Sequence, residues 1–285
     1  MMENNQTIQL GAVTLNVNNL ETQGRFYEEV IGLHIIEESS QKISLGIKET
    51  GEILLNLLPL EPKKNRLRET GLYHVAFLLP TRGALGGILR HLLEIKAPLG
   101  GAADHGYSEA LYLNDPEGNG IEIYWDKPRD VWNVQPNGKI PGITIEMDAQ
   151  GVLDASVGSL SKMPEGTKVG HVHLTGVDFE KNISFYQDIL GFSLTDDLGG
   201  HARFFGMDGY HHQIGVNNWL GEGIPTREEN SLGINQYEII WESALDFIEM
   251  KEKLAQKNYP IELKSDNVFK IVDPNGIIVY MELKK

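Results

Sequence analysis

Residues 114–125 read NDPEGNGIEIYW, and residues 272–283 read VDPNGIIVYMEL. Both segments place an Asp-Pro pair and a glycine before a run of β-branched and aromatic residues, which is typical of a tight turn that leads into a strand. Side chains alternate along a strand, so Glu122 shares a face with Tyr124. Glu122 then either faces solvent on an edge strand or is a buried charge, and a buried charge needs a partner, often a metal.

A second pair of segments matches in the same way. Residues 24–33 read GRFYEEVIGL and residues 183–192 read ISFYQDILGF. Each has a Phe-Tyr pair, a helical stretch and a glycine followed by an apolar residue. The first pair of segments is 158 residues apart, measured between the aspartates, and the second is 159 apart, measured between the phenylalanines. The two halves of the chain therefore repeat one layout.

Each half divides again into two units with the order β-α-β-β-β, so the chain holds four units. The units are expected at about 9–60, 71–126, 168–219 and 232–284, within halves at 1–126 and 167–285 that flank a connection over 127–166. The helix of the first unit is expected to end at Gly32, and the other helices are expected over about 83–96, 180–190 and 243–257. The connection is too long for a simple turn and holds one strand-like run, GITIEMD at 142–148.

Composition excludes several classes of protein. The net charge of −15 disfavours nucleic acid and anionic membranes as partners. The chain has no cysteine, so disulfides, thiolate metal sites and a cysteine nucleophile are ruled out. The first ten residues, MMENNQTIQL, have neither a basic stretch nor a long apolar run, and no segment approaches 18 consecutive apolar residues. We therefore expect a cytoplasmic protein without a signal peptide.

The repeated marks and the fourfold layout resemble the vicinal-oxygen-chelate superfamily, which includes glyoxalases, bleomycin resistance proteins and extradiol ring-cleaving dioxygenases. The resemblance covers the chain except for its connection and its ends. It implies an α+β fold in which four βαβββ modules form paired, curled, mixed sheets. In that family the sheets of two paired units enclose a cup with metal ligands inside.

The superfamily places its ligands on the first and last strands of each unit. In the first unit these strands offer Ala12 and an apolar run, and in the fourth they offer Gln236 and Ile278, so neither unit resembles a metal site. The second and third units do carry suitable residues. The resemblance implies three metal ligands in them: His74, Glu122 and His171. Two imidazoles and one carboxylate form the facial triad of non-haem Fe(II) oxygenases, although Mn(II) suits the same ligands.

The resemblance also assigns catalytic roles. His212 matches the family's acid–base histidine, while Tyr112, ten residues before Glu122, and the preceding His105 match residues that hydrogen-bond the substrate. On a strand, His211 and His212 would point to opposite faces, so at most one would enter the site. Two further groups of histidines are expected to play smaller parts. His173 shares a face with His171 and either lines the cup or reaches solvent, and the remaining three are read as surface or structural: His34, His91 and His201.

The order of the units departs from the family. Catalytic units are usually consecutive in the C-terminal half, whereas here they are the second and third. We expect units two and three to pair with each other, and units one and four to form a non-catalytic companion. Two alternatives remain open: pairing across a dimer, and pairing of one with two and three with four, which would leave two incomplete sites.

The resemblance implies an Fe(II)-dependent extradiol dioxygenase of aromatic catabolism, similar to catechol 2,3-dioxygenase. Its partners would be a small catechol-like diol and O2, and the chain could form a homo-oligomer. One alternative is a glyoxalase-type metal-dependent isomerase or lyase, although such enzymes usually place a carboxylate on the last strand of both paired units. The other is a metal-free member of the superfamily that binds a small molecule.

Overall fold

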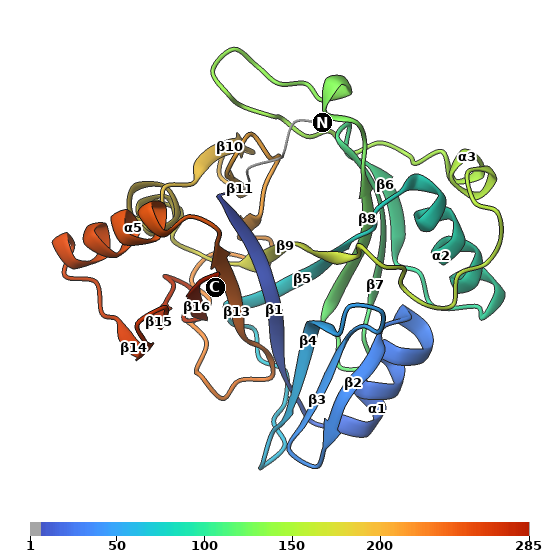
Figure 1. The fold of residues 1–285 in the computed structure, drawn as a ribbon, viewed down its shortest axis with the longest axis horizontal. Coiled ribbons are helices and arrows are strands. Elements are labelled where there is room, and N and C mark those ends of the chain that lie inside the picture. The colour runs from blue at the N-terminus through green and yellow to red at the C-terminus, as the bar shows by residue number, and fades with distance from the viewer. Residues whose placement is uncertain (1–6, 285) are drawn as a thin grey trace.

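The computed structural model describes residues 7–284, which form the four repeats seen in the sequence (Figure 1). The first repeat contains β1 (Ile8–Val17), α1 (Leu20–Phe26), a π-helical turn (Tyr27–Ile31), β2 (His34–Ser39), β3 (Lys42–Ile47) and β4 (Glu52–Pro59). The second contains β5 (Gly71–Leu78), α2 (Arg82–Glu94), β6 (Gly101–Asp104), β7 (Ser108–Asn114) and β8 (Gly120–Asp126). The third contains β9 (Lys168–Thr175), α4 (Phe179–Ile183), a π-helical turn (Ser184–Ile189), β10 (Ser193–Asp197), β11 (Ala202–Gly206) and β12 (Ile214–Asn217). The fourth contains β13 (Gly233–Trp241), α5 (Ala244–Gln256), β14 (Glu262–Ser265), β15 (Val268–Val272) and β16 (Ile278–Leu283).

The strands form two eight-stranded mixed sheets. One has the order β14-β15-β16-β13-β1-β4-β3-β2 and combines the first and fourth repeats. The other has the order β10-β11-β12-β9-β5-β8-β7-β6 and combines the second and third. The antiparallel pairs β1–β13 and β5–β9 form the seams between repeats. This confirms the expected α+β fold and the expected pairing of repeats two and three and of repeats one and four, which forms within one chain. Repeat one does not share a sheet with repeat two, nor repeat three with repeat four.

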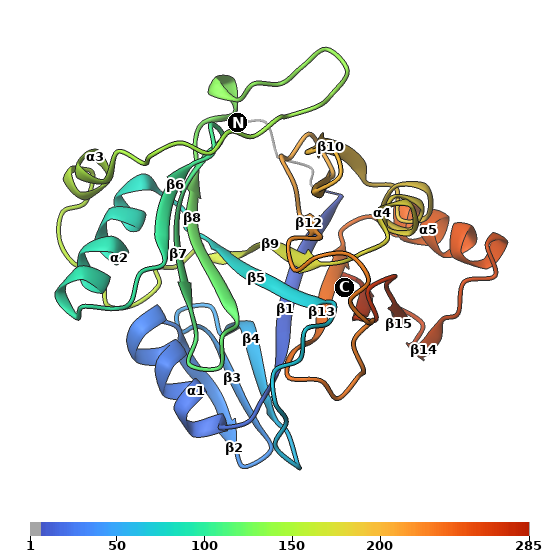
Figure 2. The ribbon, with the colours of Figure 1, turned by 180° about the vertical axis from the view of Figure 1, so that it is seen from behind.

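The helices lie outside the sheets, on opposite sides of the molecule. Figure 2 shows α1, α2 and α3 (Ala149–Asp154) on one side, with α4 and α5 on the other. One continuous cluster of buried apolar side chains draws on strands of both sheets and on the helices that cover them. Burial of this apolar surface is the main stabilising contribution to the fold. The second sheet curls (Figure 1), and residues on its strands line the cavity described below.

Local sequence signals explain where the helices begin and end. The side chains of Asn19, Thr81 and Ser243 accept backbone N–H groups in the first turns of α1, α2 and α5. Gly32 ends the first helical segment with a φ of 88°, in the left-handed region that lacks a steric penalty only for glycine. Gly32 therefore serves as the C-cap that the sequence predicted.

The connection does not contain the expected strand. The connection contains α3 and a 3-10 turn at Arg129–Val131. Residues 142–148 form no strand and make a single isolated bridge, between Ile145 and Asp104. Ile143 and Ile145 are half exposed, so the alternating apolar side chains have no second layer to pack against. The expectation of a strand was therefore wrong. The division of the chain into domains at 127–166 stays a prediction.

Two expectations concerned the membrane and the first residues. Within residues 7–284, no helix is long and apolar enough to cross a bilayer. The expectation that the N-terminus has no signal peptide rests partly on residues 1–6, which lie outside the described part of the chain.

Candidate metal centre and active site

Strand register brings three chemically active side chains to one point on the curled sheet. β5 lies between β9 and β8, and Ala76 on β5 pairs with His171 on one side and with Glu122 on the other. His74 lies two residues before Ala76 and therefore projects from the same face. The small side chain of Ala76 leaves room between the three larger ones. The site thus depends on the pairing of the second and third repeats.

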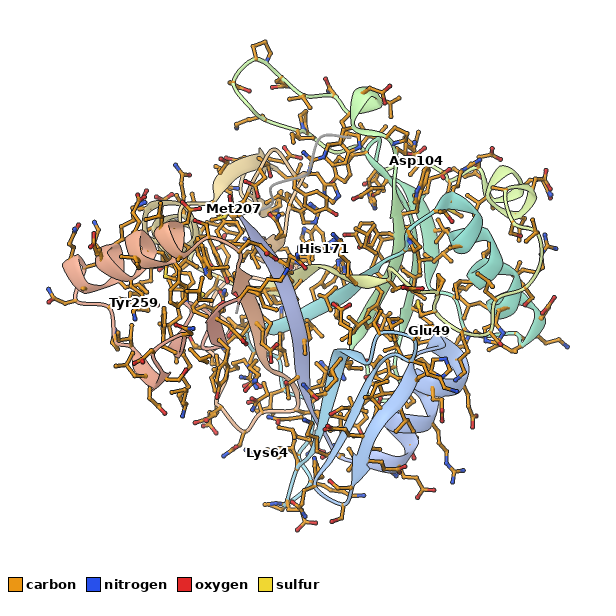
Figure 3. The ribbon with its side chains drawn as sticks, viewed as in Figure 1. Glu49, Lys64, Asp104, His171, Met207 and Tyr259 are labelled. Carbon is orange, nitrogen blue, oxygen red and sulfur yellow. The ribbon has the colours of Figure 1, made fainter. Side chains whose placement is uncertain are left out.

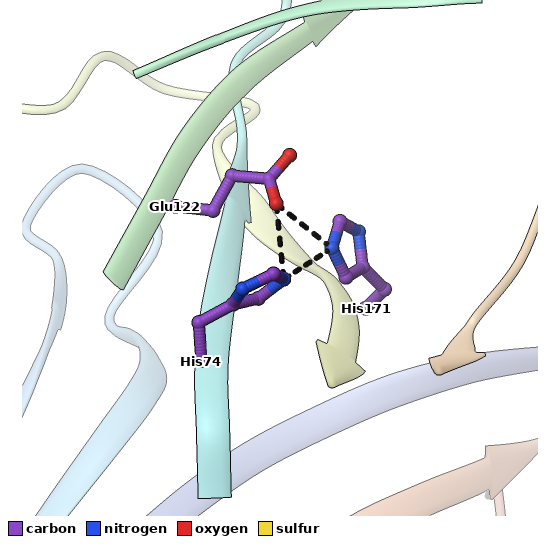
Figure 4. A group of neighbouring side chains, drawn as sticks. All are labelled: His74, Glu122 and His171. Carbon is purple, nitrogen blue, oxygen red and sulfur yellow. Dashed lines mark hydrogen bonds and ion pairs between the residues drawn. The ribbon is translucent and has the colours of Figure 1, made fainter. Parts of the chain in front are cut away.

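The three side chains meet at their functional atoms (Figure 4). The Nε2 atoms of His74 and His171 are 3.1 Å apart, and they lie 3.0 Å and 3.2 Å, respectively, from Oε2 of Glu122. All three residues are buried, with exposed fractions of 6% or less. In Figure 3, His171 lies near the centre of the molecule, whereas Lys64 lies at its lower edge. Glu122 is therefore a buried charge with partners, and the alternative of a solvent-facing edge residue was wrong.

The electrostatics suit a cation. Burial raises the pKa of Glu122, but the charges and hydrogen bonds of His171 and His74 outweigh it and hold this pKa well below its usual value. Burial lowers the pKa of His171 to about 4, although Glu122 opposes the shift. At neutral pH the group therefore combines a carboxylate with a neutral His171 imidazole, which is the protonation state that binds metal.

The donor set and its spacing fit a divalent metal. Ligand atoms about 2.1 Å from an ion and at right angles to each other lie roughly 3.0 Å apart, while tetrahedral ligands lie about 3.4 Å apart. The observed triangle, with sides of 3.0, 3.1 and 3.2 Å, matches one face of an octahedron. Two imidazoles and one carboxylate on such a face leave other coordination positions free, which is the arrangement of the facial triad. Among the described residues, this is also the group of His and acidic side chains that could hold a metal ion.

A cavity of about 380 Å³ opens onto the three residues. This size is suitable for a small organic molecule. Its wall near the surface is aromatic and apolar: Tyr73, Leu198 and Trp219 are each about half exposed, and the Tyr73 and Trp219 ring centroids are 4.9 Å apart. Among the residues that the structure describes, no lysine or arginine lines the cavity, whereas Glu122 and Asp196 do. The described side chains that line the cavity therefore offer no lysine or arginine to pair with a negatively charged substituent of a ligand.

Tyr112 and His105 lie together on one wall of this cavity. Tyr112 on β7 pairs directly with Glu122 on β8, so both side chains project from the same face. The Tyr112 hydroxyl lies 2.6 Å from Nε2 of His105, whose Nδ1 lies 2.8 Å from the carbonyl oxygen of Ile143. That carbonyl can only accept, so Nδ1 carries a hydrogen and, in the neutral ring, Nε2 accepts from Tyr112. Burial raises the pKa of Tyr112, and the charge of Glu122 adds to the effect, so the phenol stays protonated.

His211 and His212 both line the cavity, which corrects the expectation that at most one would enter the site. That expectation assumed a strand, but β12 begins only at Ile214, so the alternation of a strand does not apply to these residues. Both are buried, and their Nδ1 atoms are 2.8 Å apart. The His212 ring also lies 4.3 Å from the His171 ring, between centroids. Burial, together with the neighbouring His171 and His211, holds the pKa of His212 well below its usual value.

The other histidines separate into two groups. His173 is buried and lines the cavity, with its ring 4.9 Å from that of His74 between centroids. His91 is buried in α2, with Nε2 at 3.2 Å from the carbonyl oxygen of Glu29, while His34 and His201 are partly or fully exposed. None of these last three lines the cavity, in line with a surface or structural role.

The sequence reasoning missed Asp126 and Tyr107. Asp126 accepts a hydrogen bond from Nε2 of His211 at 2.9 Å, and the Tyr107 ring stacks on His211 with 4.2 Å between centroids. Asp126 lies four residues after Glu122 on the same strand and so on the same face. That spacing was a usable signal for Asp126. Tyr107 lies in a turn, where no periodic pattern indicates the direction of a side chain.

The sequence and the fold of this chain are similar to those of several known proteins. The family model described as "Glyoxalase/Bleomycin resistance protein/Dioxygenase superfamily" matches residues 9–123 and 168–266. The chain is 36% identical over 272 residues to the catechol-2,3-dioxygenase of Bacillus subtilis (strain 168), with 93% of each chain covered. It is 30% identical over 126 residues to biphenyl-2,3-diol 1,2-dioxygenase 3 of Rhodococcus globerulus, covering 42% of this chain and 64% of the relative. Glyoxalase I from Zea mays shares the fold, with a TM-score of 0.56 at 14% identity over 97% of this chain and 92% of the other.

Proposed function

Because this chain belongs to the glyoxalase/bleomycin resistance protein/dioxygenase superfamily, we propose that it is an Fe(II)-dependent extradiol dioxygenase that cleaves a small catechol-like diol with O2. The observation that carries the proposal is the convergence of His74, Glu122 and His171 on one buried point at the base of the cavity. The likeness to a catechol-2,3-dioxygenase over 93% of the chain supports the same reading.

These three residues would hold the metal. A bound Fe(II), or Mn(II), would orient the diol and O2 beside each other and pass electron density between them. The protein's own contribution begins with charge: one carboxylate and two neutral imidazoles leave a net positive charge on a divalent ion, which favours a deprotonated diol. Burial of the three ligands at 6% exposure or less excludes water from their side of the site.

His212 would act as the general base. His212 lines the cavity with its ring beside that of His171, and burial keeps the ring neutral at pH 7, so it can accept a proton from a diol hydroxyl. Tyr112 donates its single hydrogen to His105, so its oxygen would accept a hydrogen bond from a diol hydroxyl. These three groups all line one cavity, which suits contact with two neighbouring oxygens of one ring.

The cavity wall narrows the substrate class. A diol with an apolar substituent can pack on Trp219 and Tyr73 at the mouth, while a carboxylated catechol would meet Glu122 and Asp196 without a cationic partner. We therefore expect uncharged catechols to be the preferred substrates.

The test is oxygen consumption by the chain after anaerobic loading with Fe(II). We expect O2 uptake with uncharged catechols, in a ratio of one O2 per diol, and a ring-opened semialdehyde as product. No O2 uptake with a panel of catechols would overturn the proposal. The same protein loaded with Ni(II) or Zn(II) and given a hemithioacetal tests the glyoxalase alternative, which the single carboxylate at the site disfavours. Tight binding of an aromatic ligand by the chelator-treated chain, without turnover, would indicate a metal-free binding protein.

A further inference from the structure

A chain of three side chains runs away from the cavity behind His212. Nδ1 of His212 lies 2.8 Å from Nδ1 of His211, and Nε2 of His211 lies 2.9 Å from Oδ1 of Asp126. The contact with His211 is the one hydrogen bond of the His212 ring within residues 7–284, so its other ring nitrogen, Nε2, is not engaged by these residues, and His212 lines the cavity. The three residues therefore form one path from the cavity to the carboxylate at the end of β8.

The chemistry of the three groups fixes where the hydrogens lie. An ionised carboxylate only accepts, so Nε2 of His211 carries the hydrogen that it donates to Asp126. If the His211 ring is neutral, its Nδ1 has no hydrogen and must accept. Nδ1 of His212 is then the donor, and Nε2 of His212 presents a free lone pair to the cavity. The partner of one ring nitrogen thus determines the state of the other.

The surroundings hold His211 in this orientation. It is 1% exposed, and the Tyr107 ring stacks on it at 4.2 Å between centroids with only 9° between the planes. Trp132 covers it from another side, at 5.3 Å between centroids. This aromatic enclosure restricts rotation of the His211 ring. A rotated His211 would also break the bond to Asp126, so the ring has one preferred orientation.

We propose that His211 and Asp126 are positioning residues that keep His212 as the Nδ1–H tautomer, with its bare Nε2 directed into the cavity. The catalytic significance rests on the proposed dioxygenase function, whereas the tautomer is a property of the protein alone. When Nε2 takes the proton of a diol hydroxyl, the diol oxygen becomes negatively charged and the His212 ring becomes an imidazolium cation. The Asp126 carboxylate then stabilises that charge through the hydrogen bonds from His212 to His211 and from His211 to Asp126. The aspartate that orients the histidine in a Ser-His-Asp triad acts in a similar way.

The first test reads the tautomer directly, without turnover. The full-length chain is labelled with ¹⁵N-histidine, treated with chelator and examined at pH 7.5 by long-range ¹H–¹⁵N correlation, with His212 assigned from the His212→Phe variant. We expect a protonated Nδ1 and an unprotonated Nε2 on His212. In His211→Phe, which keeps a stacking ring but has no nitrogen, we expect His212 to revert to a mixture that favours Nε2–H. Nε2–H on His212 in the unaltered chain would overturn the proposal.

The second test uses a double-variant cycle on the Fe(II)-loaded chain. We expect His211→Phe to lower kcat about 10- to 100-fold with less than a threefold change in KM, and Asp126→Asn to lower it less, because the amide oxygen still accepts from His211. Since His211 acts through His212, adding His211→Phe to His212→Phe should cause no further loss. His91→Phe, a buried histidine outside the cavity, is the matched control and should retain kcat.

The outcomes separate the two proposals. Suppose that the unaltered chain is active and that the losses of kcat in His211→Phe and His212→Phe multiply in the double variant. The positioning role would then be overturned, while the dioxygenase function would stand. An inactive unaltered chain would overturn the dioxygenase function, and the spectroscopic test would still decide the tautomer. A fall in kcat in His211→Phe that leaves the His212 signals unchanged would indicate only a structural role for His211, and would also overturn the proposal.

Discussion

The hydroxyl of Tyr27 lies 3.1 Å from Oδ2 of Asp115, so the two repeated marks of the first half are in direct contact although 88 residues separate them. The second half repeats the contact, with the Tyr186 hydroxyl 2.8 Å from Oδ2 of Asp273. In each half, a tyrosine at the end of a helix thus anchors the turn before a final strand. For the second repeat, that final strand is β8, which carries Glu122. The motif therefore supports the site from a distance.

We expect Tyr27→Phe to destabilise the fold by about 1–2 kcal/mol, because it removes a buried hydrogen bond to a carboxylate. Asp115 would keep three other donors: the backbone N–H groups of Glu117 and Asn119 and the side-chain amide of Asn119. Asp115→Ala should cost more, since these donors then lose their acceptor. The measurement is urea unfolding at pH 7.

The control for this prediction is Tyr280→Phe. Tyr280 is half-buried on β16 and makes no side-chain hydrogen bond within the described residues. The variant should change the free energy of unfolding by less than about 0.5 kcal/mol. If both phenylalanine variants had the same stability, the Tyr27–Asp115 contact would not contribute.

Local motifs such as these explain why the repeats of the fold could be predicted from the sequence. Turn chemistry, strand alternation and helix caps are local, so the marks around Asp115 and Gly32 predicted the repeats and their order. The candidate ligand positions, His74, Glu122 and His171, came from the family resemblance, which assigns ligands to fixed places within those repeats. The pairing of inner repeats was inferred from the distribution of these residues, and the strand register bears it out.

The misses share a physical cause. The direction of His211 depends on how the segment between β11 and β12 passes over the sheet, and no strand period governs that segment. The run at 142–148 alternates like a strand, but it passes the end of β6 and touches it only at Asp104. In both places tertiary context overrides a local pattern, which sequence periodicity alone cannot anticipate.

We expect Glu122→Gln to abolish stoichiometric Fe(II) binding. The amide keeps the size of the side chain but removes the negative charge and leaves only one oxygen as a ligand atom. The measurement is metal content after anaerobic loading and desalting, with the unaltered chain near one ion per chain. The matched control is Glu109→Gln: Glu109 is equally buried, at 3% exposure, but pairs with Arg82 at 2.6 Å. If Glu109→Gln lost the metal as Glu122→Gln does, the loss would reflect the fold and not the ligand.

The chelator-treated chain should lose stability as the pH falls from about 6.5 towards about 4. The unfolded chain binds a proton at each histidine near pH 6.5, whereas burial lowers the pKa of His171 to about 4 in the folded chain. The unfolded state therefore takes up more protons in this window, which favours unfolding. The depressed pKa of Glu122 acts in the same direction, because its stabilisation is present at neutral pH and is lost on acidification.

Thermal unfolding midpoints at several pH values measure this effect. The variant His171→Gln lacks one of the two groups and should show a flatter dependence over the same range. Equal slopes in the two proteins would assign the acid sensitivity to other residues.

We expect one substitution at the mouth of the cavity to improve the relative activity towards a negatively charged substrate. Leu198 lines the cavity and is 45% exposed, so an arginine there can reach a carboxylate without being buried. Leu198→Arg should raise the ratio of kcat/KM for a carboxylated catechol over catechol by up to about fivefold, since an exposed ion pair is worth up to about 1 kcal/mol. Leu198→Gln, which adds polarity without charge, should leave the ratio within twofold, and an equal rise in both variants would contradict the electrostatic explanation.

Tyr112→Phe should lower kcat of the Fe(II)-loaded chain about 100-fold while leaving its metal content unchanged. The ring would still pack beside His74, with 5.9 Å between centroids, but the hydroxyl that joins the cavity to His105 would be lost. Tyr73→Phe is the matched control, because Tyr73 also lines the cavity and touches His74 through its ring, yet its hydroxyl makes no hydrogen bond within residues 7–284. Steady-state O2 uptake with catechol measures both variants. Similar losses in Tyr112→Phe and Tyr73→Phe would mean that the Tyr112 hydroxyl has no specific role. If Tyr112→Phe loses activity and Tyr73→Phe does not, His105→Phe should lose about as much as Tyr112→Phe, because the two residues would then act as one hydrogen-bonded unit.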